Sequence, residues 1–465
     1  MPAGMRRATR RLAALALAAA ALPLASCTST EDALSVTDPD IINPSDVQSP
    51  AGANAVRLGA LARLNAATSG EESMFLLGGL LADEWENGDS FIARQEIDQR
   101  NVTRENNFVT AASRVLHRTR VAAEQALQLL REYSPTASAA EVAEMYFVQA
   151  YVENLLAEHF CSGVVFSTVG PGGAPTYGSP ITTTATLERA LAHADSGLRL
   201  ITGTTAVDVR VRSALQVTRG RILLNLNRPA DAATAVTGVA TTFRYEMLHA
   251  PTTTSNQMWT FNNSARRYSV GANEGRNGLA FATAADPRLP TCQGGDTRCR
   301  GVGVTQTRRD NSGPLRLDIQ LLWPARESPV AIVSGVEARL IEAEAQLRAG
   351  GAAASLATLN ALRAATGTGS AGVAGLTPLT DAGTEAARVD QLFRERGFWL
   401  FSRGHRLGDL RRLIRQYSRP ANTVFPTGSW QQTGTYGNDV NFPIPQAEAN
   451  NPNVASGQGC LDRNA

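Results

Sequence analysis

Two short stretches combine a tryptophan with amide or carboxylate groups, the residue types that bind sugars. In the first, Trp85 is followed by Asn87 and Asp89, and in the second, Trp259 is followed by Asn262. Aromatic planes stack on the C–H faces of sugar rings, while amides and carboxylates hydrogen-bond to hydroxyl groups. Core packing is the other role open to such aromatic residues. We predict a ligand-binding site that includes Trp85, Asn87, Asp89, Trp259, Asn262, Tyr268 and Trp323.

Arginine residues around the second stretch favour a different ligand. Arg266, Arg267, Arg308 and Arg309 lie in the same polar region. A guanidinium group presents a planar set of donors that fits a carboxylate with two hydrogen bonds. These residues would suit an acidic glycan or a peptide, so both ligand classes stay open.

The residue patterns of a hydrolase or a metalloenzyme do not occur in the sequence. The histidines are scattered singly, and no His-x-x-x-His or Gly-x-Ser-x-Gly motif is present. Asp83, Glu84 and Glu86 could form a glycosidase pair by residue type alone, but carboxylates are too common to single them out. We expect His405 to serve packing and hydrogen bonding. We therefore predict a protein that is not an enzyme, with no catalytic residue, no metal site and no cofactor.

A charged and aromatic run at residues 394–412 reads Arg-Glu-Arg-Gly-Phe-Trp-Leu-Phe-Ser-Arg-Gly-His-Arg-Leu-Gly-Asp-Leu-Arg-Arg. Its apolar residues recur at helical spacings on one side, with arginine and glutamate on the other. The pattern predicts a helix whose aromatic residues lie in the core. We expect Glu395 to join Arg403 and Arg406 in a partly buried ion-pair network that locks this helix.

This run, followed by Asn-Phe-Pro-Ile-Pro at 441–445, resembles the C-terminal signature of the SusD/RagB family. Four other segments resemble the family in the expected order, namely the acidic loop 78–84, the aromatic helix 146–151, the Asp-Pro-Arg-Leu turn 286–289 and the alanine-glutamate helix 337–345. One departure is Val-Ser-Gly at 333–335, where many members carry an Arg-Tyr pair. That departure bears on ligand details more than on the fold.

The resemblance implies a function at the cell envelope. Members of this family are surface lipoproteins that capture a glycan or a peptide and pass it to a TonB-dependent, SusC-like outer-membrane transporter, over which they sit as a hinged lid. We therefore expect an oligosaccharide or peptide ligand and a barrel transporter as partners. The alternative is a helical lipoprotein scaffold that organises an envelope complex and binds no small ligand.

Residues 1–26 have the pattern of a signal peptide. Four arginines precede an alanine- and leucine-rich run from Leu12 to Leu22, which is too short to span a bilayer. The sequence Leu-Ala-Ser-Cys at 24–27 reads as a lipobox, so Cys27 is expected to carry the lipid anchor. Residues 27–50, rich in Ser, Thr, Asp and Pro, would form a flexible tether. Because several acyl chains give stable attachment, we predict an outer-membrane protein anchored at the cell surface.

The charge of the chain gives no reason to expect a nucleic-acid partner. The sequence has 44 basic and 42 acidic residues, and all the basic ones are arginine. Cleavage of the signal peptide removes four arginines and no acidic residue, which leaves a formal charge of −2. A nucleic-acid-binding protein would carry a basic excess on one face.

Four cysteines remain after Cys27, and an even number in an exported chain suggests disulfides. Three connectivities exist for four cysteines. Cys292 and Cys299 bracket a Gly-Gly-Asp loop and are the natural local pair, which leaves Cys161 with Cys460. A metal site is the rival interpretation, but no histidine lies nearby.

Helical periodicity dominates residues 53–64, 108–133, 139–160 and 187–201. Two helix pairs of the tetratricopeptide type, with short turns and small residues for close approach, are expected at 211–226 with 230–240 and at 336–349 with 352–365. Residues 241–330 are richer in Gly, Asn, Thr, Arg and Pro, as loop-rich binding segments usually are. We predict a mostly α-helical SusD-like scaffold with an N-terminal helical part (51–240), a loop-rich inserted lobe (241–330) and a C-terminal helical part (331–465).

Overall fold

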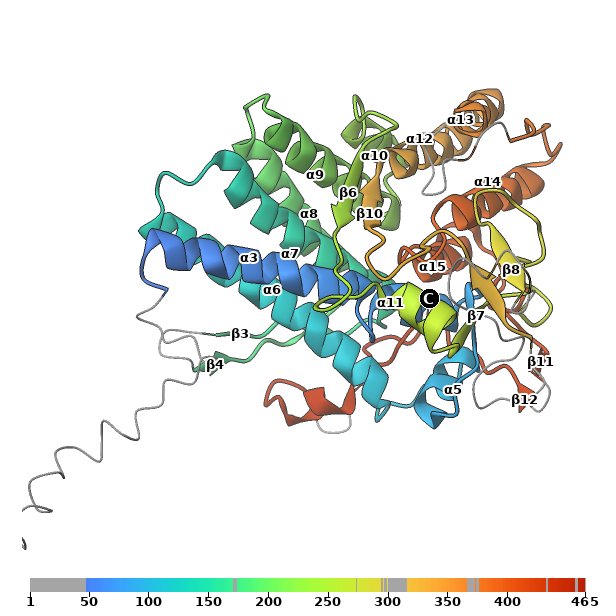
Figure 1. The fold of residues 1–465 in the computed structure, drawn as a ribbon, viewed down its shortest axis with the longest axis horizontal. Helices are drawn as coiled ribbons and strands as arrows, with labels where there is room; N and C mark the ends of the chain where they lie inside the picture. Colours follow the sequence, from blue (N-terminus) through green and yellow to red (C-terminus); the bar gives the residue numbers. More distant parts are fainter. Residues whose placement is uncertain are drawn as a thin grey trace, which may run out of the picture. The chain divides into compact units, whose positions relative to one another are not determined.

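A computed structural model describes residues 47–169, 174–272, 274–293, 296, 299, 316–365, 373, 376–431, 434–455 and 459–464. Ser49–Ala465 form one compact unit, drawn in Figure 1. The predicted signal peptide, Cys27, Arg308 and Arg309 lie outside the described residues. In the part that is described, no helix has the length and apolar character needed to cross a membrane.

Long helices build one side of this unit, and Figure 1 shows them packed side by side. They are α3 (Pro50–Ser69), α6 (Asn107–Tyr133), α7 (Ala139–His159), α8 (Thr183–Leu200) and α9 (Ala206–Asn225). The four helical stretches predicted from periodicity are confirmed within a few residues at each end. Side-chain caps explain several starts: Ser138 and Glu141 form a reciprocal capping box at the start of α7.

The two predicted helix pairs are also present. Helix α9 pairs with α10 (Pro229–Ala235), and α12 (Gly335–Arg348) pairs with α13 (Ala352–Ala364). The turns contain residues with left-handed backbone angles, Asn227 with φ 61° and Gly350 with φ 81°. Glycine allows close approach at Gly220 of α9, where a Cβ atom would lie 2.7 Å from the side chain of Val236. The mostly α-helical fold predicted from the sequence is therefore confirmed.

Short antiparallel strand pairs tie the loop-rich segment to the rest of the unit. Strand β7 (Tyr268–Val270) pairs with β1 (Trp85–Asn87), and β6 (Arg244–Met247) pairs with β10 (Val330–Ser334). Residues from all three predicted parts share one hydrophobic core. The expected boundaries at 240 and 330 thus mark a change of secondary structure within one compact unit.

The remaining elements surround these pairs. Near the N-terminal helices and the loop-rich segment lie α4 (Met74–Leu81), α5 (Ile92–Asp98), β2 (Val164–Val165), β3 (Thr168–Val169), β4 (Pro175–Thr176), β5 (Pro180–Ile181), α11 (Gln257–Trp259), the π-helix η3 (Thr260–Ser264), β8 (Thr291–Gln293) and β9 (Asp318–Gln320). The C-terminal part adds α14 (Glu385–Trp399), α15 (Arg406–Tyr417), α16 (Ala421–Val424), β11 (Ser429–Trp430), β12 (Gly434–Thr435) and the 3-10 helix η5 (Gln446–Asn450).

The single helix expected over residues 394–412 is wrong, because the chain turns between α14 and α15. Ser402 and Gly404 have φ values of 50° and 69°, which end the first helix. A Cβ atom on Gly404 would lie 2.7 Å from the ring of Phe75, so the turn also packs against α4. The aromatic residues before the turn are buried as predicted.

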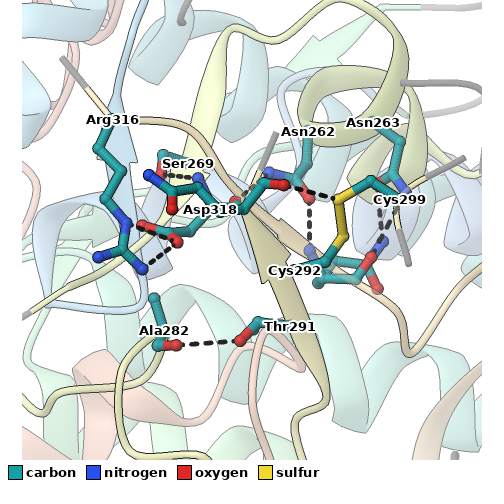
Figure 2. Close-up of a disulfide and its surroundings, with 11 residues drawn as sticks. Asn262, Asn263, Ser269, Ala282, Thr291, Cys292, Cys299, Arg316 and Asp318 are labelled. Carbon is teal, nitrogen blue, oxygen red and sulfur yellow. Dashed lines mark hydrogen bonds and ion pairs between the residues drawn. A yellow bond between two sulfur atoms is a disulfide. The ribbon is translucent and has the colours of Figure 1, made fainter. Parts of the chain in front are cut away.

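Both predicted disulfides are present. Cys161 bonds to Cys460 across a sequence separation of 299, and Cys292 bonds to Cys299 across 7. Figure 2 shows the second bond beside the β8–β9 pair, where the two cysteines form a small separate core with Leu317 and Ile319. The first bond holds the C-terminal end of the described chain against the residues that follow α7.

Candidate functional site

Four of the five segments that resemble the SusD/RagB signature meet through buried ion pairs, and the fifth, the aromatic helix 146–151, lies in the hydrophobic core. Asp83 bonds to both sides of the Arg406 guanidinium group, at 2.6 Å each. Glu344 pairs with Arg412, and the Glu337 carboxylate lies 3.0 Å from the His405 ring. Each of these contacts joins residues from two of the five segments, so the motifs fix how the helices pack.

Glu395 belongs to this network, but its predicted partners are wrong. Its carboxylate pairs with Arg288, at 2.6 Å, and with Arg363, at 2.7 Å. Arg406 pairs with Asp83 instead, while Arg403 donates to the backbone carbonyl of Trp399. Glu395 still locks its helix through ion pairs, as predicted, but with other partners. These pairs join α14 to the Asp-Pro-Arg-Leu turn and to α13.

Glu84 is a buried carboxyl group beside this network. Its Oε1 accepts a hydrogen bond of 2.7 Å from the backbone N–H of Ser402, and its Oε2 has no partner among the described residues. Burial raises the pKa of Glu84 to about 8, and the neighbouring Asp83 carboxylate adds to the shift. Glu84 is therefore protonated at neutral pH.

The substitution Glu84→Gln is expected to raise the free energy of unfolding in alkaline solution. The folded protein keeps this proton up to about pH 8, whereas the unfolded chain loses it near the ordinary value of 4.5, so stability falls as the pH rises between these values. Glutamine stays neutral and can still accept from Ser402. Urea unfolding should show a gain of about 4–5 kcal/mol at pH 8.5 and little at pH 4. Equal gains at both values would contradict this assignment.

The structure corrects the exposure expected for most predicted ligand residues. Six of the seven are buried, namely Trp85, Asn87, Asp89, Asn262, Tyr268 and Trp323. The indole N–H of Trp85 donates to the Ser402 hydroxyl at 2.9 Å, and its ring centre lies 5.1 Å from that of Phe401. Trp85 thus offers no free face to a sugar in this structure, and its replacement would disturb the core.

Asn87 and Asp89 instead shape the loop that carries Phe91. The Asn87 amide donates to the Asp89 carbonyl at 2.9 Å, and the Asp89 N–H donates to the Asn87 side chain at 3.1 Å. The Asp89 carboxylate then accepts from the Phe91 N–H at 3.1 Å and pairs with Arg94 at 2.7 Å. These bonds fix the backbone on which Phe91 stands.

Asn262 has a similar supporting role between β7 and β9, as Figure 2 shows. Its amide donates to the carbonyls of Tyr268, at 2.8 Å, and Asp318, at 3.0 Å. Its oxygen accepts from the N–H of Gln320 at 2.9 Å, and the Gln320 side chain bonds to the backbone of Trp323. The predicted residues of the second stretch therefore hold these strands together.

An exposed aromatic surface lies over this framework, and we call Phe91, Ile92, Phe108 and Arg267 the Phe91 surface. Phe91 is 52% exposed and Ile92 72% exposed. The rings of Phe91 and Phe108 meet edge to face with centres 6.1 Å apart. The Arg267 guanidinium lies 5.6 Å from the centre of the Phe91 ring and 3.4 Å from the Asp89 carboxylate. This surface has an exposed aromatic plane, which was expected at Trp85 and Trp259, beside Arg267, which the sequence did single out.

Trp259 is the predicted residue that stays partly exposed. It ends the short helix α11, its indole N–H donates to the Pro324 carbonyl at 3.0 Å, and the Arg326 guanidinium lies 5.2 Å from its ring centre. Two residues further on, Phe261 contacts Arg267, at 5.8 Å between ring centre and guanidinium. The segment that carries Trp259 therefore adjoins the Phe91 surface.

Phe91 was not among the predicted ligand residues, because a phenylalanine followed by isoleucine ordinarily marks a core position. A signal was available in the local pattern. Phe91 is the N-cap of α5 and Ile92 its first residue, whereas the buried apolar residue of this helix is Ile97. Ile92 precedes Ile97 by five residues, a spacing that puts the two on different sides of a helix, and the preceding Asp-Ser favours a helix start.

No site for a metal is found in the described part of the chain, where no group of three or more His, Cys, Asp or Glu side chains could hold an ion. The histidines there have structural contacts. The ring of His159 bonds to the Leu155 carbonyl at 2.9 Å, and His193 lies 2.8 Å from the Glu153 carboxylate.

Comparison by sequence identifies no match, either to a family model or to a curated protein. Comparison by structure gives many. A SusD-like carbohydrate-binding protein from Bacteroides fragilis superposes with a TM-score of 0.62 at 16% identity, over 88% of this chain and 99% of that one. A SusD superfamily protein from Parabacteroides distasonis gives 0.60 at 13% identity, over 87% and 99%.

A SusD/RagB family protein from Bacteroides thetaiotaomicron gives a TM-score of 0.59 at 11% identity, over 85% of this chain and 93% of that one. Identities this low establish the fold alone. The same fold thus extends over most of the chain. The chain has the fold of the SusD/RagB superfamily.

Proposed function

We propose that this protein binds an oligosaccharide and delivers it to a TonB-dependent outer-membrane transporter. The observation that carries the proposal is the Phe91 surface on a SusD/RagB fold, a fold shared with a protein described as carbohydrate-binding. An exposed ring of this kind can stack on a sugar, and the neighbouring arginine can donate to hydroxyl or carboxylate groups. Binding, and not catalysis, is the role that such a surface supports.

The proposal includes attachment to the outer membrane through Cys27. The lipobox at 24–27 and the tether at 27–50 would hold the helical unit near a barrel transporter, leaving it free to open and close as a lid. Metabolic labelling with a fatty acid tests the anchor, because Cys27→Ala should abolish the label. The transporter is tested by co-purification from membranes of the native host.

The substitution Phe91→Ala is expected to weaken oligosaccharide binding at least tenfold. Loss of a stacking aromatic residue costs a binding site about 1–3 kcal/mol, by analogy with bases stacked on aromatic side chains. Leu248→Ala is the matched control, because Leu248 is a 73% exposed apolar side chain outside the Phe91 surface. Calorimetric titration with the strongest ligand from a glycan library gives the affinities, and circular dichroism checks the fold.

Equal affinity in Phe91→Ala and the parent would show that the Phe91 surface is not the binding site. Arg267→Gln then tells how an intact site recognises its ligand. A loss confined to acidic glycans would assign Arg267 to carboxylate recognition. If the parent protein binds peptides and no glycan, the ligand class proposed here is wrong. If it binds neither, and no barrel protein co-purifies, the scaffold interpretation replaces the proposal.

A further inference from the structure

A groove with a volume of about 760 Å³ runs along α6, apart from the Phe91 surface. Its floor is α6 from Thr110 to Gln125, and its walls come from the β2–β3 segment, the start of β4, the residues around η5 and one side chain of α3. Ligand sites for small molecules usually have volumes of about 300–1,000 Å³. The groove is therefore large enough for a short oligomer.

Arginine side chains dominate the charge of this groove. Arg114 and Arg118 are exposed and stand one turn apart on α6, and Arg63 reaches the groove from α3. Within the described residues, none of these three has a carboxylate within ion-pair distance, unlike most arginines of the unit. Three cations close together without partners repel one another, so an anion between them would be stabilised.

The buried Arg120 has a structural role at the base of the groove. Its guanidinium pairs with Glu124 at 3.4 Å and donates to the carbonyl of Ser167, which joins α6 to the β2–β3 wall. Glu448 is the acidic side chain on the opposite wall, and burial raises its pKa. One carboxyl against three unpaired guanidinium groups leaves the groove positively charged.

The groove has little with which to bind a neutral sugar. His117 supplies the one aromatic ring among its described lining residues, and that ring packs edge-on against Phe166, with centres 5.9 Å apart. Burial lowers the pKa of His117 to about 3, so the ring adds no charge at neutral pH. Hydroxyl groups of Ser113 and Thr168 line the groove, and that of Thr110, which donates to the Asn106 carbonyl at 3.0 Å, can still accept a hydrogen bond. Recognition here must depend on charge and hydrogen bonds.

We infer that the α6 groove is a second binding site, which takes an acidic oligosaccharide whose neighbouring units carry carboxylates. Residues four apart on a helix have Cβ atoms roughly 6 Å apart, so Arg114 and Arg118 present two separate guanidinium forks. Each fork can hold one carboxylate through two hydrogen bonds, which fits a chain of spaced carboxylates better than one compact anion. The sugar nature of the ligand rests on the proposed function, whereas its charge rests on the groove.

Calorimetric titration of the purified protein with trigalacturonate tests this site. The neutral comparison is the same trisaccharide with all its carboxylates methyl-esterified. We expect trigalacturonate to bind at least tenfold more tightly than the ester, with an affinity that falls as salt is added. The ester binding as tightly as the acid would overturn the inference.

Variants locate the site. The groove pair, Arg114→Gln with Arg118→Gln, should weaken trigalacturonate binding at least tenfold. The control pair, Arg199→Gln with Arg228→Gln, removes the same charge from exposed positions elsewhere and should leave the affinity for trigalacturonate unchanged. Thr110→Trp fills the groove without altering the charge and should also block binding. If the control pair loses as much affinity for trigalacturonate as the groove pair, the loss comes from the lower net charge of the whole protein, and a binding site in the groove is refuted.

These experiments can refute the groove site without refuting the proposed function, and the reverse also holds. Phe91→Ala should leave trigalacturonate binding to the groove intact, so binding that depends on Phe91 and not on Arg114 would refute the groove alone. If trigalacturonate does not bind and the groove pair instead loses the co-purifying barrel protein, the groove is a contact surface for the transporter, and the inference is overturned.

Discussion

Replacing Cys161 and Cys460 together by alanine is expected to lower the free energy of unfolding by about 5 kcal/mol, because the bond closes a long loop of the unfolded chain. The closed loop spans a sequence separation of 299, and the bond anchors the C-terminal residues beside α7. Without it, the unfolded chain gains conformational freedom and the C-terminal residues lose a covalent attachment. Guanidinium unfolding of the double variant, compared with the parent, measures the difference.

The second disulfide is the matched control for this prediction. Cys292 and Cys299 are separated by 7 residues, so Cys292→Ala with Cys299→Ala should cost about 2 kcal/mol on the same entropic argument. The pair lies in its own small core, away from the main one. A larger loss from the short closure than from the long one would contradict the chain-entropy account for this protein.

Asp409→Ala is expected to lower the free energy of unfolding by about 3–5 kcal/mol, because it removes the carboxylate that bonds to buried Arg396 and one of the two carboxylates that bond to buried Arg412. The Asp409 carboxylate accepts from Arg396 at 2.7 and 2.9 Å and from Arg412 at 2.8 Å. All three side chains are buried. The control is Asp390→Ala, which removes an exposed carboxylate from its 3.0 Å pair with Arg419 and should cost about 0–1 kcal/mol.

The same variant should show a pH dependence of known sign. The two guanidinium groups outweigh burial and hold the pKa of Asp409 well below its ordinary value of 3.8. The stability that Asp409 contributes is therefore complete above that value and is lost as the pH falls toward the folded-state pKa. The difference in the free energy of unfolding between the parent protein and Asp409→Ala should become smaller below about pH 4. A constant difference down to pH 2 would contradict the assigned ion pairs.

The helical scaffold could be predicted because its helices follow local rules. The periodicities of α6 and α7 come from residues within each helix, and Ser138 and Glu141 set a start from four residues of sequence. The break between α14 and α15 was missed, since the apolar spacing continues across Ser402 and Gly404. The left-handed backbone there is stabilised by packing against α4, a contact that lies far away in the sequence.

The pairing of the buried charges and the exposure of the aromatic rings were harder to predict, because both depend on contacts between residues far apart in the sequence. Arg406 can be buried because Asp83, 323 residues earlier, supplies both bonds to it, and no local pattern contains that information. Trp85 has the composition expected of a sugar-binding loop, yet Ser402 and Phe401 cover it from the other end of the chain. Composition singled out a loop for its aromatic and amide residues, but burial determined which ring near it reaches the surface.

The long disulfide also sets an order of events during synthesis. A chain that grows at about 5–20 residues per second reaches Cys460 roughly 15–60 seconds after Cys161. Cys292 and Cys299 are made in that interval, so the Cys161 thiol meets two other thiols before its own partner exists. A premature bond to either would have to be exchanged later. Early pairing of Cys292 with Cys299, only 7 residues apart, removes both competitors and keeps Cys161 available.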